Sequence, residues 1–487
     1  MSPSTSTRAT TPVPTFASIG VPSVINCKGT FTIVSGSRAL TQVVQAMAEA
    51  TNHYVDMDLL MRKVGERLGE LMQCEFGYVA TGCAAGLAGL TAACMAGTDP
   101  EKMARLPNTA GMKNEVISQK RHRNTYDHAI RLTGAKFVEV VTRADLEAAI
   151  SERTAMIAIT GSCQPWETIP VAEMIEVGHK HGIPCIVDAA AERPDVPNRY
   201  LTLGADAVAY SGGKCLRGPQ SSGLILGRRD LLWAAFMNGA PHHALCRPMK
   251  ASKEEVMGLL AAVEAWVRGR DHQAEWRMWE SYLETIRVAV ATVPTVRTRI
   301  EMPGYSNVAP MLHIAWDEVT LGCNPSQIAD ELMAGNPPIV MPARPDALVV
   351  MPYMMETGDA EIVAQRLVAL MSNRSTAGQP LPVKPAPAVN VAGQWEIETT
   401  YSLGASKHSM TLKQEGAVLS GDYRSQFAWT TVQGSVSGNE VTLNASIRYE
   451  ASGVEYAYKG VVEGDTMRGT VDMGEYFAAE WVAHRLA

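Results

Sequence analysis

Three short stretches of the sequence carry residue types that could bind or transform a small molecule. Residues 81–85, Thr-Gly-Cys-Ala-Ala, end an expected strand and open an expected helix, where small residues let backbone amides approach an anion. Asp188 closes the apolar run 184–188, and a carboxylate at such a place is costly to bury without a partner. Lys214 follows Ser211 and two glycines, and a partly desolvated lysine amine is an effective carbonyl nucleophile.

Each stretch also has an ordinary structural explanation. Residues 81–85 could be a tight helix–strand corner, Asp188 a helix N-cap, and Lys214 a solvated loop lysine. In this order, at the carboxyl ends of parallel strands, the three indicate one cofactor, pyridoxal 5′-phosphate (PLP). The first turn would hold its phosphate, the carboxylate would pair with its protonated ring nitrogen, and the lysine would form its Schiff base.

A wider resemblance supports this interpretation. Residues 24–371 resemble the fold-type I PLP-dependent enzymes, which are related to the class V aminotransferases. Within them they resemble the selenocysteine synthase-like branch, which includes L-seryl-tRNA selenium transferases and D-glucosaminate-6-phosphate ammonia-lyases. The segments that carry the resemblance are VINCKGTFT, YVDMDLLMRKVGERL, TGCAAGLA, IPCIVDAAAERP and, most specifically, SGGKCLRGPQSSGLILG.

The resemblance implies a role for each matching residue. Lys214 resembles the Schiff-base lysine and Asp188 the partner of the ring nitrogen. Ala190 would pack on one face of the ring. The phosphate would be held by a group of small residues in two turns: Thr81, Gly82, Cys83 and Ser211.

Other candidates come from the same comparison with the family. His122 is expected to stack on the second face of the ring as a catalytic residue, with His128 as the rival and a capping or surface histidine as the ordinary alternative. Arg123, Arg217 and Arg344 are candidates for binding the substrate. Arg344 could pair with a substrate carboxylate, although it also suits an exposed turn. The methionine-rich run 351–355 is expected on a strand of the small lobe that faces the active site.

The elements that must position these residues follow from the apolar pattern. Between residues 76 and 227, short runs that are apolar throughout alternate with helical segments, which predicts a mostly parallel α/β sheet with helices on both faces. The resemblance implies that this sheet is of the seven-stranded type. Residues 253–297 have the pattern of one long helical region. From about residue 392, polar and apolar residues alternate between Gly, Asn and Asp turns, which predicts a small antiparallel β-domain, closed or nearly closed into a barrel.

These patterns predict six successive parts of the chain. They are a flexible tail (1–20), the N-terminal part of a small lobe (21–44), a PLP-binding large domain (45–275), the rest of the small α/β lobe (276–375), a Pro/Ala linker (376–391) and the β-domain (392–487).

Composition limits the classes of partner. The 487 residues carry a net charge of −7 without a concentrated basic stretch, so we expect no nucleic acid as partner. No apolar run is long enough for a transmembrane helix, which favours a protein that does not span a membrane. The nine cysteines are scattered without CxxC pairs, which is typical of reduced cytoplasmic thiols and predicts no metal site.

The expected function is a PLP-dependent lyase that acts at Cα of a small amino acid or amino-sugar acid, by an ammonia-lyase or dehydratase type of elimination. Racemisation or epimerisation, amino transfer and β-replacement begin with the same loss of the Cα proton and stay open alternatives. The non-enzyme alternative is a binding protein that uses the β-domain for recognition. The resemblance also implies a homodimer or a higher homo-oligomer.

Overall fold

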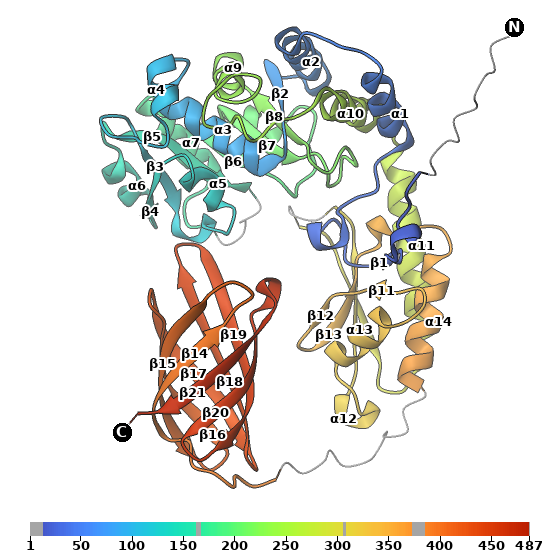
Figure 1. Cartoon of the computed structure of the whole chain (residues 1–487). Helices are drawn as coiled ribbons and strands as arrows, with labels where there is room; N and C mark the ends of the chain where they lie inside the picture. Colours follow the sequence, from blue (N-terminus) through green and yellow to red (C-terminus); the bar gives the residue numbers. More distant parts are fainter. Residues whose placement is uncertain (1–12, 162–166, 305–307, 373–384, 487) are drawn as a thin grey trace, which may run out of the picture. The chain divides into compact units, whose positions relative to one another are not determined.

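The computed structural model describes residues 13–161, 167–304, 308–372 and 385–486. These residues form two compact units. The first holds those up to Gln379 except Arg123–His128, and the second holds Arg123–His128 together with the C-terminal domain from Pro380 (Figure 1). The expected tail (1–20) and linker (376–391) lie partly outside the described residues. The proposed domain boundaries stay predictions.

A central sheet dominates the first unit, and seven of its strands lie in the described residues. In spatial order these are β2 (Phe76–Ala80), β8 (Gly223–Gly227), β7 (Ala207–Ser211), β6 (Cys185–Asp188), β5 (Thr154–Thr160), β3 (Glu115–Gln119) and β4 (Lys136–Val140). The strands from β7 to β4 pair in parallel, whereas β8 pairs antiparallel with both of its neighbours. This is the mostly parallel sheet that the apolar runs predicted.

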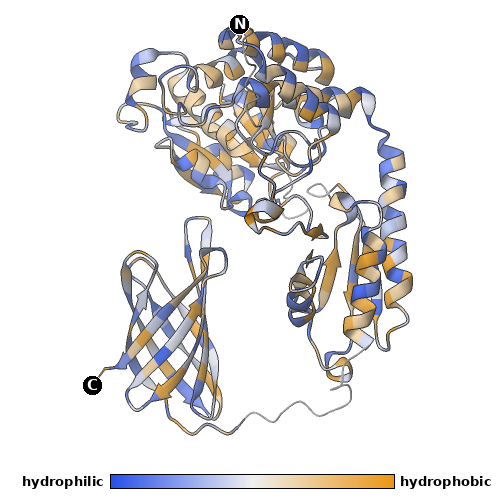
Figure 2. Ribbon diagram, turned by 45° about the vertical axis from the view of Figure 1, so that its right-hand side comes forward, coloured by the Kyte–Doolittle hydropathy of each residue, from blue (hydrophilic) through white to orange (hydrophobic). Residues whose placement is uncertain are grey.

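Alternate residues of each strand enter different cores, one on each face of the sheet. On β7, Val208 packs in one core, while Ala207 and Ala209 pack in the other. The first core is covered by α2 (Met57–Met72), α7 (Val171–Lys180) and α10 (Lys253–Glu264), and the second by α3 (Cys83–Ala96) and α9 (Arg229–Met237). Because both faces are covered, strands β5 to β8 are apolar along most of their length, whereas the edge strand β4 carries the exposed Lys136 and Glu139 (Figure 2).

Helix α3 lies close to the sheet because both surfaces carry small side chains. A Cβ added to Gly86 would stand 2.3 Å from Cδ1 of Ile225 on β8, so any larger residue here would displace that buried side chain. The alanines of β7 on the same face leave room for the helix. This packing places the N-terminus of α3 at the carboxyl end of β2, where the first candidate turn lies.

Five further helices lie in the described residues of this part of the chain: α1 (Thr41–Thr51), α4 (Pro100–Arg105), α5 (Asp127–Arg131), α6 (Arg143–Ala149) and α8 (Arg199–Thr202). The helical region expected at 253–297 is interrupted. After α10 the chain forms a π-helical turn at Ala265–Gly269, Arg270 is extended, and the Asp271 side chain caps α11 (His272–Val290). No helix in the described part of the chain is both long and apolar enough to cross a membrane.

A smaller α/β lobe completes the first unit. Its antiparallel sheet has the order β12 (Ala343–Arg344), β13 (Ala347–Val350), β10 (Met311–Ala315) and β9 (Arg297–Glu301), packed with α11, α13 (Pro325–Met333) and α14 (Asp359–Ser372), and α12 (Glu318–Leu321) lies beside it. Separately, β1 (Ile25–Asn26) pairs in parallel with β11 (Ile339–Val340), so the N-terminal segment joins this lobe.

The second unit is a closed antiparallel barrel of eight strands. They are β14 (Gly393–Thr400), β15 (Ala405–Glu415), β16 (Val418–Arg424), β17 (Trp429–Ser437), β18 (Glu440–Tyr449), β19 (Ser452–Glu463), β20 (Thr466–Asp472) and β21 (Ala478–Arg485), and β14 pairs with β21 to close it. Polar and apolar residues alternate along each strand, as Figure 2 shows. The prediction of a closed antiparallel β-domain is confirmed.

Candidate active site

The first part of the site is the turn between β2 and α3. Gly82 is the N-cap of α3 with a φ of +118°, and no side chain caps the helix. On β8, Gly223 lies directly against this turn, since a Cβ there would stand 2.7 Å from the backbone nitrogen of Cys83. The positive end of the helix dipole and the first amides of α3 therefore meet at a place that fits an anion.

Asp188 lies beside this turn, at the carboxyl end of β6. Its Oδ1 accepts a hydrogen bond from the Ala190 N–H (3.0 Å) and lies 3.5 Å from Cys83 Sγ. Burial raises the pKa of the Cys83 thiol well above its usual range. The charge of Asp188 raises it further, and the charge of Lys214 lowers it. Cys83 thus lies within electrostatic reach of both candidate groups, and three separate strand ends come together here.

The loop after β7 explains why two glycines precede Lys214. A Cβ on Gly212 would stand 2.1 Å from Ser222 Oγ, and one on Gly213 would stand 2.5 Å from Gln220 Oε1. The loop is therefore folded tightly on itself, and it holds the partly buried Lys214 close to the end of β7. Ser211, the last residue of β7, donates its N–H to the Ala190 carbonyl (3.3 Å), which joins this loop to the segment after Asp188.

His122 is buried at the end of β3, two strands away from β6. Its Nδ1 accepts a hydrogen bond from the backbone N–H of Thr160 (3.2 Å), and Thr160 is the register partner of Asp188. Burial lowers the pKa of His122 to about 4, so the ring is neutral at pH 7. The rival, His128, is exposed in α5.

The three candidate arginines occupy different settings. Arg123 is buried and forms an ion pair with Asp127. Arg344 is exposed on β12. Arg217 lies three residues after Lys214 and lines a pocket with the side chains of Trp266 and Tyr353. The run 351–355 is not a strand, because β13 ends at Val350 and a 3₁₀ helix, Pro352–Met354, follows.

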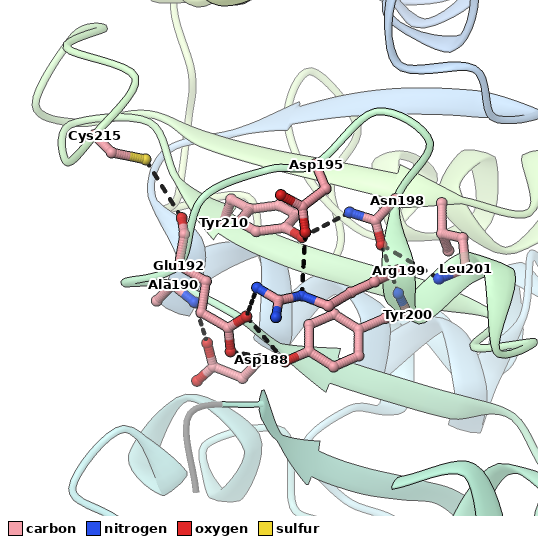
Figure 3. A network of polar contacts seen from close by, with 10 residues as sticks. All are labelled: Asp188, Ala190, Glu192, Asp195, Asn198, Arg199, Tyr200, Leu201, Tyr210 and Cys215. Atoms are coloured by element: carbon pink, nitrogen blue, oxygen red, sulfur yellow. Dashed lines mark hydrogen bonds and ion pairs between the residues drawn. The ribbon is translucent and has the colours of Figure 1, made fainter. Parts of the chain in front are cut away.

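A polar cluster that the sequence did not reveal lies directly after Asp188 (Figure 3). Glu192 is fully buried, accepts a hydrogen bond from the Tyr200 hydroxyl (2.8 Å), and pairs with Arg199 (2.9 Å). Burial raises the pKa of Glu192 to about 7, despite these two partners. A Cβ on Gly161 would stand 2.4 Å from both Glu192 Oε1 and the Tyr200 hydroxyl, so a larger residue there would disturb this pair.

The cluster around Glu192 links the chain segments that carry Asp188 and Lys214. Asn198 donates to the Tyr210 hydroxyl (2.6 Å), and Tyr210 belongs to β7 immediately before Ser211. The Glu192 carbonyl lies 3.3 Å from Cys215 Sγ, one residue after Lys214. The segment after β6 and the loop after β7 are thus tied together. The only sequence signal for Glu192 was an acidic residue near a strand end, which is equally common on surfaces.

The chain is similar to several known proteins. The family of Cys/Met metabolism PLP-dependent enzymes matches residues 61–229. The chain is 31% identical over 331 residues to a D-glucosaminate-6-phosphate ammonia lyase of Salmonella typhimurium, covering 66% of this chain and 87% of the relative. It is also 31% identical over 375 residues to a 5′-C-glycyluridine monooxygenase-decarboxylase of a Streptomyces species, covering 74% and 92%.

A solved structure extends the likeness to the fold. The structure of a D-glucosaminate-6-phosphate ammonia-lyase superposes with a TM-score of 0.67 at 28% identity, covering 74% of this chain and all of that one. The matched part therefore leaves out about a quarter of the chain, while the relative is matched in full. From these relatives, and from the strand-end site, the chain belongs to the fold-type I PLP-dependent enzymes, in the branch that includes the D-glucosaminate-6-phosphate ammonia-lyases.

Proposed function

We propose that this protein is a PLP-dependent lyase that acts at Cα of a small amino acid or amino-sugar acid and releases ammonia. The observation that carries the proposal is the convergence of Asp188 and Lys214 on the buried Cys83 thiol, at the N-terminus of α3. The similarity to an ammonia lyase over most of that enzyme's length supports the reaction class.

The residues present fit the cofactor. An uncapped helix N-terminus suits a phosphate, and the glycine at position 223 keeps the approach to its amides clear of side chains. A carboxylate that already accepts one backbone N–H is held in place to accept a second proton donor from the ring nitrogen. The lysine lies on a loop whose backbone is held by tight packing.

Each side chain would then have a distinct task. The amides of Gly82 and Cys83, with Thr81 and Ser211, would hold the phosphate, and Asp188 would pair with the ring nitrogen. When bound, PLP supplies an electron sink that stabilises negative charge at the substrate Cα. Lys214 Nζ would take the proton from Cα, since an amine is a competent general base once it is neutral.

His122 would serve as a neutral ring beside the cofactor. Its Nδ1 is already occupied by the Thr160 N–H, and its lowered pKa excludes a cationic role at pH 7. Ala190, whose amide is held by Asp188, would pack on the opposite face. These two residues would orient the cofactor, whereas Lys214 would move the proton.

A second candidate reaction breaks the bond from Cα to the carboxylate. It is favoured by the relative named as a monooxygenase-decarboxylase, which is as similar to this chain as the ammonia lyase and is matched over more of its length. The two reactions differ in which Cα bond breaks, so their products distinguish them.

The test is a product analysis of the purified, cofactor-loaded protein. A panel of D- and L-amino acids and amino-sugar acids is scored separately for ammonia, carbon dioxide, oxygen uptake and loss of chirality. Ammonia release without oxygen uptake is expected. Carbon dioxide with oxygen uptake would instead favour the second candidate, and loss of chirality alone would identify a racemase. A protein that shows no visible cofactor band removable by borohydride would overturn the whole proposal.

We also infer a homodimer or higher homo-oligomer. Several large apolar side chains of the N-terminal segment are exposed in the single chain: Phe16, Ile19, Phe31, Ile33, Val44, Tyr54, Val55 and Leu59. Ile33 is 78% exposed and Tyr54 is fully exposed, which suits a surface that a second subunit covers. Sedimentation of the wild type should give at least a dimer, and Ile33→Asp should shift it toward the monomer. A fully active wild-type monomer contradicts the inference.

A further inference from the structure

A pocket begins one residue after Lys214. It is a small hollow of about 40 Å³, bounded by Cys215 and Arg217 on one side and by α11 and the turn 353–355 on the other. A wider, open hollow of about 360 Å³ adjoins it, and Arg217 and Tyr353 line both. The two hollows are therefore neighbours, and Arg217 belongs to both.

The pocket is lined by more positively charged than negatively charged side chains. The small hollow is lined by Arg193, Arg217 and Arg270 but by one carboxylate, Glu275. Arg270 binds Glu275 with two hydrogen bonds, of 2.8 and 2.9 Å, so each of these two charges already has its partner. Among the residues that the structure describes, Arg193 and Arg217 form no ion pair.

The wider hollow does not supply a carboxylate for Arg193 or Arg217. Its carboxylate, Glu356, forms an ion pair with Arg38. The backbone carbonyl of Arg38 accepts a hydrogen bond from the Arg217 Nε–H (2.9 Å). This bond fixes the orientation of the Arg217 guanidinium and leaves the two terminal nitrogens for another acceptor.

Arg217 differs in its electrostatics from the arginines that have carboxylate partners. Burial lowers its pKa, and the charges of Arg270 and Arg38 lower it further, although Glu275 opposes them. By contrast, hydrogen bonds that Arg143 and Arg228 donate to carboxylates raise the pKa of these two arginines. A partly buried cation of this kind is stabilised by an anion that enters its pocket.

The backbone and the walls of the pocket favour the same ligand. Arg217 has a φ of +55°, an uncommon conformation for a residue with a side chain, held by the bond from its N–H to the Lys214 carbonyl (2.9 Å). The Arg193 guanidinium lies 5.3 Å from the centre of the Trp266 ring. Trp279 and Tyr353 add an aromatic wall, with their ring centres 6.4 Å apart. Such walls exclude water and strengthen an ion pair formed between them.

We propose that Arg217 and Arg193 form an anion subsite that binds an anionic oxygen group of the substrate, a carboxylate or a phosphate. The inference rests on the proposed function in one respect only, that the substrate's amino group is bound at Lys214. The arginine pair and the pocket stand on their own geometry. The substrate class is thus an amino acid with an anionic group that reaches past Cys215.

Calorimetric titration of the full-length, PLP-saturated protein tests the subsite, because saturation occupies the cofactor's own phosphate site. Inorganic phosphate and acetate are the two probes. Arg217→Gln and Arg193→Gln should weaken probe binding by about tenfold or more, as expected for the loss of a charge-assisted contact. Arg287→Gln is the matched control, since Arg287 is exposed on α11 and pairs with Glu284. Arg217→Lys retains the charge and should bind with intermediate affinity.

The two probes distinguish the sources of the anion. Preference for phosphate indicates a phosphorylated substrate, whereas preference for acetate indicates a carboxylate. Equal binding by wild type and Arg217→Gln, or no binding by the wild type, overturns the subsite. The cofactor band of each variant shows that it is folded and loaded. Arginine-dependent binding in a protein that releases no ammonia would uphold the subsite while refuting the proposed lyase.

Discussion

The active-site region and the barrel both bury polar side chains, but they satisfy them differently. In the barrel, one hydrogen-bonded chain runs through Tyr401, Ser406, His408, Tyr423 and Tyr458, and each member has a neighbour in the chain as partner. At the strand ends of the first unit, Lys214, Arg217 and the first amides of α3 border a turn or a pocket instead. The members of this barrel chain thus use one another as partners, whereas the site offers groups that a ligand can use.

This difference has a physical reason. Antiparallel strands that close into a barrel pair all their edges and point alternate side chains inward, so polar interior groups must find partners among themselves. Parallel strands end together at one edge of a sheet, where loops and helix N-termini leave donors and charges without internal partners. Three substitutions and one truncation test whether the strand-end site, and not the barrel, carries the function. They are given from the largest expected effect to the smallest.

Lys214→Ala should have the largest effect. Loss of the amine removes both the covalent link to the cofactor and the base for the Cα proton, so turnover should fall by about 10³-fold or more. The visible absorbance of the bound cofactor should change to that of unlinked PLP, while the far-UV circular dichroism stays unchanged. Normal turnover in this variant contradicts the assignment of Lys214.

Asp188→Asn should have a smaller but severe effect. The amide still accepts the Ala190 N–H, so the turn after β6 should keep its shape. It cannot stabilise a protonated ring nitrogen, and kcat should fall by about 10²-fold while the cofactor stays bound. The measurement is kcat together with the cofactor band. Wild-type kcat would show that Asp188 serves only as a turn-forming residue.

Glu192→Gln should alter the pH dependence of the free energy of unfolding more than it alters turnover. Because burial raises the pKa of Glu192 from 4.5 to about 7, the folded state holds this proton more tightly than the unfolded chain does. Below pH 4.5, this tighter proton binding adds nothing to the pH dependence and its contribution to the free energy of unfolding is fully present. The contribution is lost as the pH rises from 4.5 through about 7, and it amounts to on the order of 3 kcal/mol for a shift of this size.

Denaturant unfolding at a series of pH values checks this effect. The glutamine variant should lose the part of the pH dependence between pH 5 and 7 that comes from Glu192. Glu284→Gln is the control, because Glu284 is exposed and its pKa is lowered by Arg287. Identical pH profiles for wild type and Glu192→Gln would show that Glu192 is ionised throughout, as a partner of Arg199.

Removal of the barrel should have the smallest effect on the cofactor. A chain that ends after Ser372 keeps every candidate residue for PLP, and the barrel has its own core built around Trp395 and Trp481. The cofactor affinity, measured from the absorbance band, should change by less than about twofold. A lost band would mean that the two units fold as one cooperative structure. A raised KM with an intact band would give the barrel a part in binding the substrate.

The sequence by itself determined the architecture and the identity of the strand-end groups. Fully apolar strands that alternate with helices require a sheet covered on both faces, and two-residue alternation requires a half-polar β-surface, so both sheets were predictable. Asp188 and Lys214 stood out because a charge at the end of an apolar strand is costly without a purpose. Their roles rest on resemblance and await the experiments above.

Only the tertiary structure decided which groups meet. Cys83, Asp188 and Lys214 come from three separate segments, and no local pattern encodes their separation in space. Glu192 resembles any surface glutamate until Gly161 and Tyr200 are found packed around it. Arg217 was one candidate arginine among three, and the structure sets it apart because neighbours from α11 and the small lobe enclose it without a carboxylate of its own. Burial and pairing are properties of contacts between distant residues, so sequence order could not supply them.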